Sequence, residues 1–97
     1  MNTIKPIANY IFTFAKDDQG NDIKYRFMLT INKNITKDKN LSNSLLKLFN
    51  SIDGINYTGW TGNYTIEIQI ARTFNPDEVI DALKKILDQV LSDIIVV

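Results

Sequence analysis

Carboxylates, lysines and tyrosines are the chemically useful side chains of this sequence, because it contains neither cysteine nor histidine. Thiol nucleophiles, disulfides, zinc ribbons, cysteine-ligated iron–sulfur clusters and histidine acid–base catalysis are therefore excluded. Asp17, Asp18 and Asp22 surround Gly20 in a pattern that suggests a Ca²⁺ loop. The twelve-residue spacing and the terminal glutamate of such a loop are missing, so the segment is predicted to be a hairpin turn.

Other catalytic arrangements are also weak. The segment Gly59–Gly62 is too short for a phosphate-binding loop, and no lysine follows it. Two carboxylates can act as acid and base, but most acids here fall in expected loops or on solvent-facing helical positions. Lys84 and Lys85 lie among the acidic residues of the last predicted helix and are expected to balance their charge at the helix surface. We therefore expect no catalytic, cofactor-binding or metal-binding residues, no small-molecule site and no enzyme activity.

The charged residues are balanced in number but unevenly spread. Eleven basic and eleven acidic residues leave no net charge, which argues against a generally basic nucleic-acid binder. Residues 1–47 carry eight basic and four acidic side chains, whereas residues 48–97 carry three and seven. Such a bipolar surface orients an encounter or drives head-to-tail association. The alternative is that lysine simply favours the loop and aspartate the helix start, and that the charge distribution recognises no partner.

Length and composition predict one folded domain over residues 1–97, with 44% hydrophobic and 23% charged residues. No basic region leads into a long apolar stretch at the N-terminus, and the longest apolar run is Ile94–Val97. A membrane span needs about 20 residues, so we expect a cytoplasmic protein with no membrane association. Frequent Asn, Ile and Lys favour an AT-rich source, such as a low-GC microbe, a phage or a mobile element.

Four strands are predicted, in two hairpins. Residues 6–15 are β-branched and aromatic, and after a turn-rich segment residues 23–31 alternate apolar and polar side chains. Residues 55–60 and 63–71 form the second pair. The alternation predicts one buried face for each strand. In the second and fourth strands the inward set is Ile23, Tyr25, Phe27, Leu29, Ile31, Tyr64, Ile66, Ile68 and Ile70.

Two helices are predicted from apolar residues spaced three and four apart. The first has Asn40 as its N-cap and ends before Gly54. Its apolar face is Leu41, Leu45, Leu48, Phe49 and Ile52. The second begins with Asn75 as its N-cap and Pro76 in the first helical position. Its apolar face is Val79, Leu83, Ile86, Leu87, Val90 and Leu91.

The predicted order of elements is ββαββα. The economical arrangement is an α+β two-layer sandwich, in which a four-stranded antiparallel sheet carries both helices on one face. Moving the first strand to the end would produce the βαββαβ order of the ferredoxin-like fold. We therefore predict a permuted ferredoxin-like domain.

This arrangement leaves the second face of the sheet uncovered. The side chains expected there are Asn9, Ile11, Thr13, Lys24, Arg26, Met28, Thr30, Thr65, Glu67 and Gln69. Such a mixed composition suits a protein contact surface. A platform for single-stranded nucleic acid is the second interpretation, although the glycine and aromatic run typical of such sheets is missing. A solvated face without a role is the third.

One stretch resembles a known family. Residues 45–55, Leu-Leu-Lys-Leu-Phe-Asn-Ser-Ile-Asp-Gly-Ile, together with Tyr64–Ile68, are similar to a helix–turn–strand stretch in the N-terminal domain of Nfu/NifU-type iron–sulfur scaffold proteins. The resemblance implies a ferredoxin-like α+β fold. The cluster-binding cysteines of that family belong to a separate domain, and this chain has no cysteine, so no cluster-carrying role is implied.

These observations predict a small non-enzymatic protein-interaction module, of the kind that a phage or mobile element uses to inhibit a host complex. The partner is expected to be another protein or a second copy of the chain. The interaction residues are expected to be Lys24, Arg26, Met28, Lys33, Lys37, Lys39, Tyr57 and Trp60. The alternative is a nucleic-acid-binding domain that contacts phosphates through the basic loop at residues 32–39 and the open sheet face.

Overall fold

The computed structural model describes residues 10–32 and 39–91. Its elements are β1 (Tyr10–Lys16), β2 (Asp22–Ile31), α2 (Lys39–Asn50), β3 (Ile55–Trp60), β4 (Thr65–Ile70) and α3 (Pro76–Leu91). The predicted order of two strands, a helix, two strands and a helix is therefore confirmed. The expected start of the first strand at residue 6 and the segment Ile94–Val97 lie outside the described residues.

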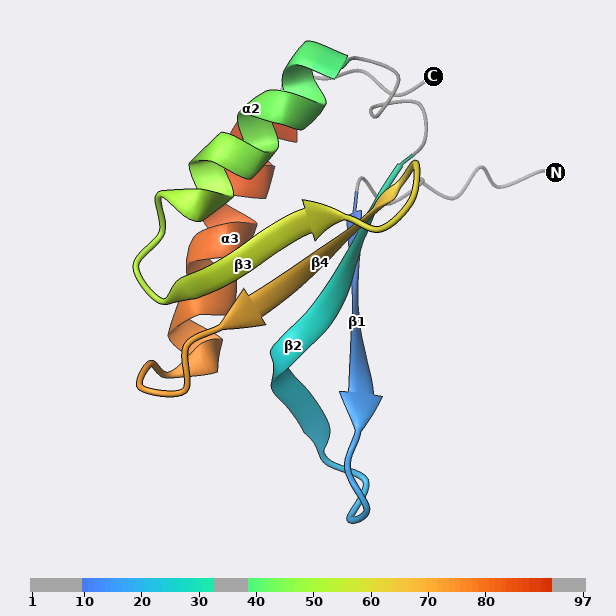
Figure 1. Cartoon of the computed structure of the whole chain (residues 1–97), viewed down its shortest axis with the longest axis vertical. Helices are drawn as coiled ribbons and strands as arrows, with labels where there is room; N and C mark the ends of the chain where they lie inside the picture. The colour runs from blue at the N-terminus through green and yellow to red at the C-terminus, as the bar shows by residue number, and fades with distance from the viewer. Residues whose placement is uncertain (1–9, 33–38, 92–97) are drawn as a thin grey trace, which may run out of the picture.

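The four strands form one antiparallel sheet in the order β1-β2-β4-β3 (Figure 1). β2 and β4 are the central strands, and β1 and β3 are the edges. α3 passes behind β3 and β4 in this view, and side chains of both helices pack into one core against the same face of the sheet. The α+β class is confirmed. No helix in residues 39–91 is long and apolar enough to cross a bilayer.

The hydrophobic core lies between the helices and the sheet. The strands contribute Phe27, Leu29, Ile31, Ile66, Ile68 and Ile70, and the helices contribute Leu45, Phe49, Val79, Ile80, Leu83, Leu87 and Leu91. Within the described ranges no polar side chain is buried. The core is therefore held by apolar packing, as the alternating strands and striped helices predict.

Three side chains predicted to be inward are exposed, namely Ile23, Leu48 and Tyr64. Tyr64 is 44% exposed because it belongs to the turn before β4, where the alternation of the strand has not begun. Leu48 is 39% exposed because the buried line of α2 runs through Leu45 and Phe49, with Leu48 at its flank.

A register shift in the first hairpin changes which side chains face the helices. Phe14 pairs with Phe27, but the next residue, Ala15, pairs with Ile23. Three residues of β2, numbers 24–26, therefore have no counterpart on β1. Because directly paired residues point to the same side of a sheet, Ile23 joins Ala15 on the face away from the helices. The prediction that Ile23 faces inward is wrong, and this bulge is the reason.

The predicted caps have different outcomes: α2 begins at Lys39, so Asn40 lies inside the helix and is not its N-cap, whereas the cap of α3 is formed as predicted. The Asn75 side-chain Oδ1 accepts a hydrogen bond from the backbone N–H of Asp77 at 3.0 Å, which confirms Asn75 as the N-cap of α3. Between α2 and β3, Gly54 has a backbone φ of +97°, a conformation that residues with a Cβ rarely adopt. Its carbonyl accepts a hydrogen bond from the N–H of Ala71 at 2.7 Å, which ties this turn to the end of β4.

Replacing Gly54 by alanine tests this turn. A Cβ at position 54 would lie 2.8 Å from Cγ of Phe74 and 3.1 Å from Cγ2 of Val79, in addition to the strain of the positive φ. We expect Gly54→Ala to lower the free energy of unfolding in urea by about 1–3 kcal/mol. Gly62→Ala is the matched control, because no atom lies within 4 Å of its Cβ position and its φ is not positive. Equal stability of the two variants would contradict the assigned role of Gly54.

Candidate functional site

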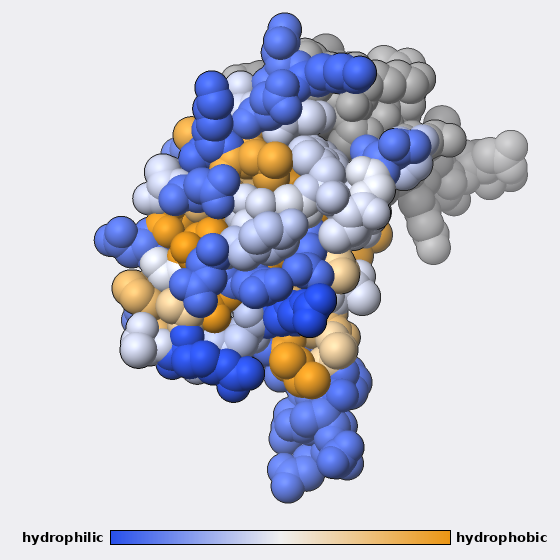
Figure 2. All heavy atoms as spheres, in the orientation of Figure 1, coloured by the Kyte–Doolittle hydropathy of each residue, from blue (hydrophilic) through white to orange (hydrophobic). Residues whose placement is uncertain are grey.

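The sheet face away from the helices is the candidate site, and we call it the open face. It consists of Ile11, Thr13, Ala15, Ile23, Arg26, Met28, Thr30, Tyr57, Gly59, Thr65, Glu67 and Gln69. Figure 2 views the molecule from this side and shows mostly hydrophilic and neutral colours, with smaller hydrophobic patches. The turn of the first hairpin projects beyond the rest of the molecule as a polar finger (Figures 1 and 2).

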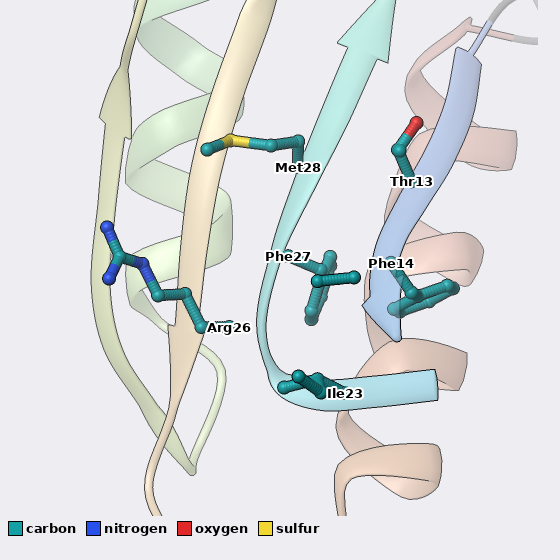
Figure 3. Close-up of a pocket in the computed structure, with 7 residues that line it drawn as sticks. Thr13, Phe14, Ile23, Arg26, Phe27 and Met28 are labelled. Carbon is teal, nitrogen blue, oxygen red and sulfur yellow. The ribbon is translucent and has the colours of Figure 1, made fainter. Parts of the chain in front are cut away.

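A hollow of about 460 Å³ lies where β1 and β2 change register, and we call it the β1–β2 hollow. Its lining is Thr13, Phe14, Ala15, Ile23, Arg26, Phe27 and Met28 (Figure 3). Five of these seven side chains are apolar. In Figure 3 the chain of β2 turns sharply between Arg26 and Ile23, below the arrowhead of β1. The bulge therefore opens a space between two paired strands that a regular ladder would close.

The half of the open face formed by β1 and the β1–β2 hollow has two aliphatic side chains that contact solvent extensively. Ile11 on β1 is 58% exposed, and Ile23 at the hollow is 38% exposed. Single exposed apolar side chains are ordinary, but here they accompany an apolar hollow and the side chain of Met28. This half of the open face therefore offers a compact apolar contact area.

The other half of the open face is a connected polar group. The Arg26 Nη2 donates a hydrogen bond to Glu67 Oε1 at 2.9 Å, and the Gln69 Nε2 donates to Glu67 Oε2 at 2.8 Å. The hydrogen bond from Gln69 and then the one from Arg26 lower the pKa of the Glu67 carboxyl. The cation and the anion neutralise each other, so this half presents oriented polar groups with little net charge.

Tyr57 forms the end of the polar half on edge strand β3. Its side chain is 46% exposed, and its ring lies over Gly59, where a Cβ would collide with the phenol oxygen. Gly59 therefore provides the space that lets the ring lie along the sheet rather than project from it. Tyr57, predicted as an interaction residue, is thus an exposed side chain on the open face.

Two of the predicted interaction residues lie elsewhere. Lys24 falls inside the bulge, and its Nζ donates to Asp77 Oδ1 of α3 at 2.8 Å, so it points to the helix side. This hydrogen bond raises the pKa of the Lys24 ammonium. Trp60 pairs with the buried Ile66 and packs partly buried against the core, so it too belongs to the helix side. The prediction that Lys24 lies on the open face is therefore wrong, and Trp60 is partly buried on the helix side.

The remaining predicted residues divide into three groups. Arg26 and Met28 lie on the open face, and in Figure 3 both side chains extend across the sheet toward β4. Lys39 is the exposed first residue of α2. Lys33 and Lys37 lie outside the described residues, and so does most of the expected basic loop. Ile23 was missed as a site residue, because a three-residue bulge leaves no signal in a pattern that alternates without interruption.

The acidic turn between β1 and β2 is organised by its own backbone. The Asp17 Oδ1 accepts hydrogen bonds from the N–H groups of Gln19 and Asn21, both at 2.9 Å. Backbone hydrogen bonding, chiefly from Asn21, lowers the pKa of Asp17. The hairpin-turn prediction is therefore confirmed. Across residues 10–32 and 39–91, no three metal-ligating side chains are grouped closely enough to hold an ion.

No protein-family model matches this chain, and no curated protein shows significant similarity to it. Inference about function therefore starts from the open face and its chemistry.

The polar half of the open face makes a specific prediction about pH. The pKa of Glu67 is lowered in the folded protein from its ordinary value of 4.5, so the carboxylate adds stability above that pH and loses it as pH falls through the folded pKa. We expect Gln69→Leu to raise the pKa of Glu67 more than Arg26→Met does, because Gln69 is the larger cause. NMR titration of the Glu67 side chain measures both effects, and a wild-type pKa of 4.5 would contradict the assignment.

Proposed function

We propose that this chain is a small non-enzymatic protein-interaction module that binds a partner protein through the open face. The observation that carries the proposal is the β1–β2 hollow, which lies on the face that both helices leave uncovered. An apolar side chain of the partner would enter the hollow between Ile23 and Met28. The exposed Ile11 would extend the apolar contact along β1.

The arrangement of the open face supports this proposal. Protein interfaces commonly combine a small apolar centre with a polar rim whose hydrogen bonds are satisfied. Here the hollow supplies the apolar centre, while Arg26, Glu67 and Gln69 supply oriented polar groups beside it. Because these polar groups already bind one another, covering them costs less than burying isolated charges.

We also propose that the fold is a permuted ferredoxin-like arrangement. The sheet order β1-β2-β4-β3 supports it, because moving β1 to the end of the chain produces a βαββαβ order. The resemblance of residues 45–55 to Nfu/NifU-type N-terminal domains is part of this proposal at the level of the fold. The role as a phage or mobile-element inhibitor stays a prediction from composition.

The alternative function, nucleic-acid binding, has less support from the described residues. Lys24 binds Asp77 and Arg26 binds Glu67, so the two cations of β2 have acidic partners rather than open positions for phosphates. The aromatic side chains of β1 share the helix side with Phe27 rather than the open face. Among the described residues, Tyr57 is the aromatic side chain that lies on the open face, and one ring gives less support than the two or three stacking aromatics of nucleic-acid-binding sheets.

A photo-crosslinking experiment tests the protein-binding proposal. A photoreactive amino acid at position 28 should capture a specific partner protein in cells of the source organism, because Met28 lies on the open face beside the hollow. The same group at the exposed position 85 of α3 should not capture it. Mass spectrometry of the adducts identifies the partner.

Matched substitutions show whether the hollow causes the capture. Ile23→Glu should abolish it, because a charge would replace an apolar wall of the hollow. Leu48→Glu on α2 is the control, since Leu48 has nearly the same exposure as Ile23, 39% against 38%. Circular dichroism verifies that both variants are folded. Capture that survives Ile23→Glu, or that is equal from position 85, would contradict the proposal.

Oligonucleotide binding tests the alternative. We expect no measurable affinity for a generic single-stranded oligonucleotide at low salt, because the β2 cations have acidic partners. Fluorescence anisotropy at low and physiological salt measures it. Salt-dependent binding that Arg26→Gln weakens would instead favour the nucleic-acid function.

A further inference from the structure

We propose that the chain self-associates by antiparallel pairing of β1 with β1 of a second copy, around a two-fold axis at Thr13. This dimer would join two four-stranded sheets into one continuous sheet, with helices on one side and the two open faces side by side. The inference goes beyond the proposed function, because it uses the free edge of β1 rather than the surface of the open face.

The edge of β1 is suited to further pairing. Among the described strands, β1 pairs with β2 alone, so its other edge carries backbone N–H and C=O groups that no described strand binds. The extra residues of the bulge belong to β2, and β1 keeps a regular extended course through Tyr10–Lys16. Natural edges are commonly protected by proline, by central charges or by bulges of their own. β1 contains no proline, and its single charged residue, Lys16, is its last.

The sequence of β1 reads similarly in both directions around Thr13. Antiparallel pairing about this residue places Thr13 opposite Thr13, Phe12 opposite Phe14, and Ile11 opposite Ala15. Each side chain therefore meets one of similar character. Because opposite residues point to the same side, the phenylalanines would meet on the helix side and the aliphatic pair on the open face.

The side chains of β1 leave room for such a neighbour. Phe12 and Phe14 stack with centroids 6.3 Å apart, and Phe14 also packs 5.1 Å from Phe27, yet both β1 rings are only partly buried. The Lys84 ammonium of α3 lies over the Phe12 ring at 5.9 Å. Pairing of two copies would continue this aromatic row across the dimer and cover Ile11, which is 58% exposed in the single chain.

Charge at the ends of the strand favours the same register. Tyr10 would lie opposite Lys16 of the second copy, on the helix side. The Tyr10 hydroxyl donates to Asp88 Oδ1 of α3 at 2.7 Å, so a carboxylate already stands at that end of the strand. Burial, together with Asp88, raises the pKa of Tyr10 to about 12, so the phenol keeps the proton that it donates to Asp88. Lys16 already donates a hydrogen bond to Asp22 of its own chain, so this ion pair as a whole would lie beside Tyr10 and Asp88 of the second copy. Zero net charge adds no general repulsion between the copies.

Sedimentation of the full chain tests the association. We expect a concentration-dependent mass that approaches twice the 11.1 kDa of one chain. Thr13→Lys should raise the dimer dissociation constant at least about tenfold, because it sets like charges opposite each other at the axis. Thr30→Lys is the matched control, an exposed threonine of the open face on central strand β2, and should leave the dissociation constant unchanged.

Disulfide trapping tests the register, and the absence of native cysteine makes the result unambiguous. Directly opposite Cα atoms are about 4.5–5.5 Å apart, within the range of a disulfide. A mixture of Ile11→Cys and Ala15→Cys chains should therefore form a linked heterodimer under mild oxidation. Ile11→Cys alone should link poorly, because its two cysteines would be offset by four residues, or about 13 Å.

Three results would overturn the inference: a monomer at every soluble concentration, a dimer that Thr13→Lys does not weaken, or equal trapping of Ile11→Cys with itself. The proposed function fails by a different result, since it depends on capture of another protein from position 28. A monomer that still captures that protein would contradict the proposed dimer and leave the proposed function standing. A dimer that captures no other protein from position 28 would contradict the proposed function and leave the dimer standing.

Discussion

The burial of two helical stripes against the same side of one sheet is the constraint on which this structure depends. The described residues bury no polar side chain, so apolar packing between Phe27, Leu29 and the helix residues must hold the layers together. One helix layer is enough to cover one face, and the second face is left to solvent. The open face, on which the proposed function depends, follows from that asymmetry.

The bulge in β2 modifies the asymmetry locally. Three extra residues reverse the inward and outward alternation, so that Ile23 turns to the open face and Lys24 turns to Asp77 at the start of α3. The same distortion opens the β1–β2 hollow. Such bulges often occur where a sheet changes the direction of a side chain, and here the redirected side chain, Ile23, forms one wall of the hollow.

The open face and the β1 edge are compatible surfaces. Pairing of two β1 strands would occupy backbone groups at the edge, while the hollow opens on the surface of the sheet beside it. The two hollows of a dimer would then lie on one continuous face, which allows a partner to be bound by both copies at once. Two weak contacts held in this way bind more tightly than either does alone.

The sequence by itself determined the order of the elements, the α+β class and most of the core, because local periodicities of two and of three to four report directly which side of each element is apolar. It also determined the cap at Asn75 and the Asp17 turn, which depend on hydrogen bonds between near neighbours. Only the tertiary structure decided the positions of Ile23, Lys24 and Trp60. Those positions depend on a register shift and on contacts with residues distant in the chain, which an alternating pattern does not encode. The hollow arises from that same register shift, so it depends on how β1 and β2 pair and cannot be predicted from the sequence of either strand alone.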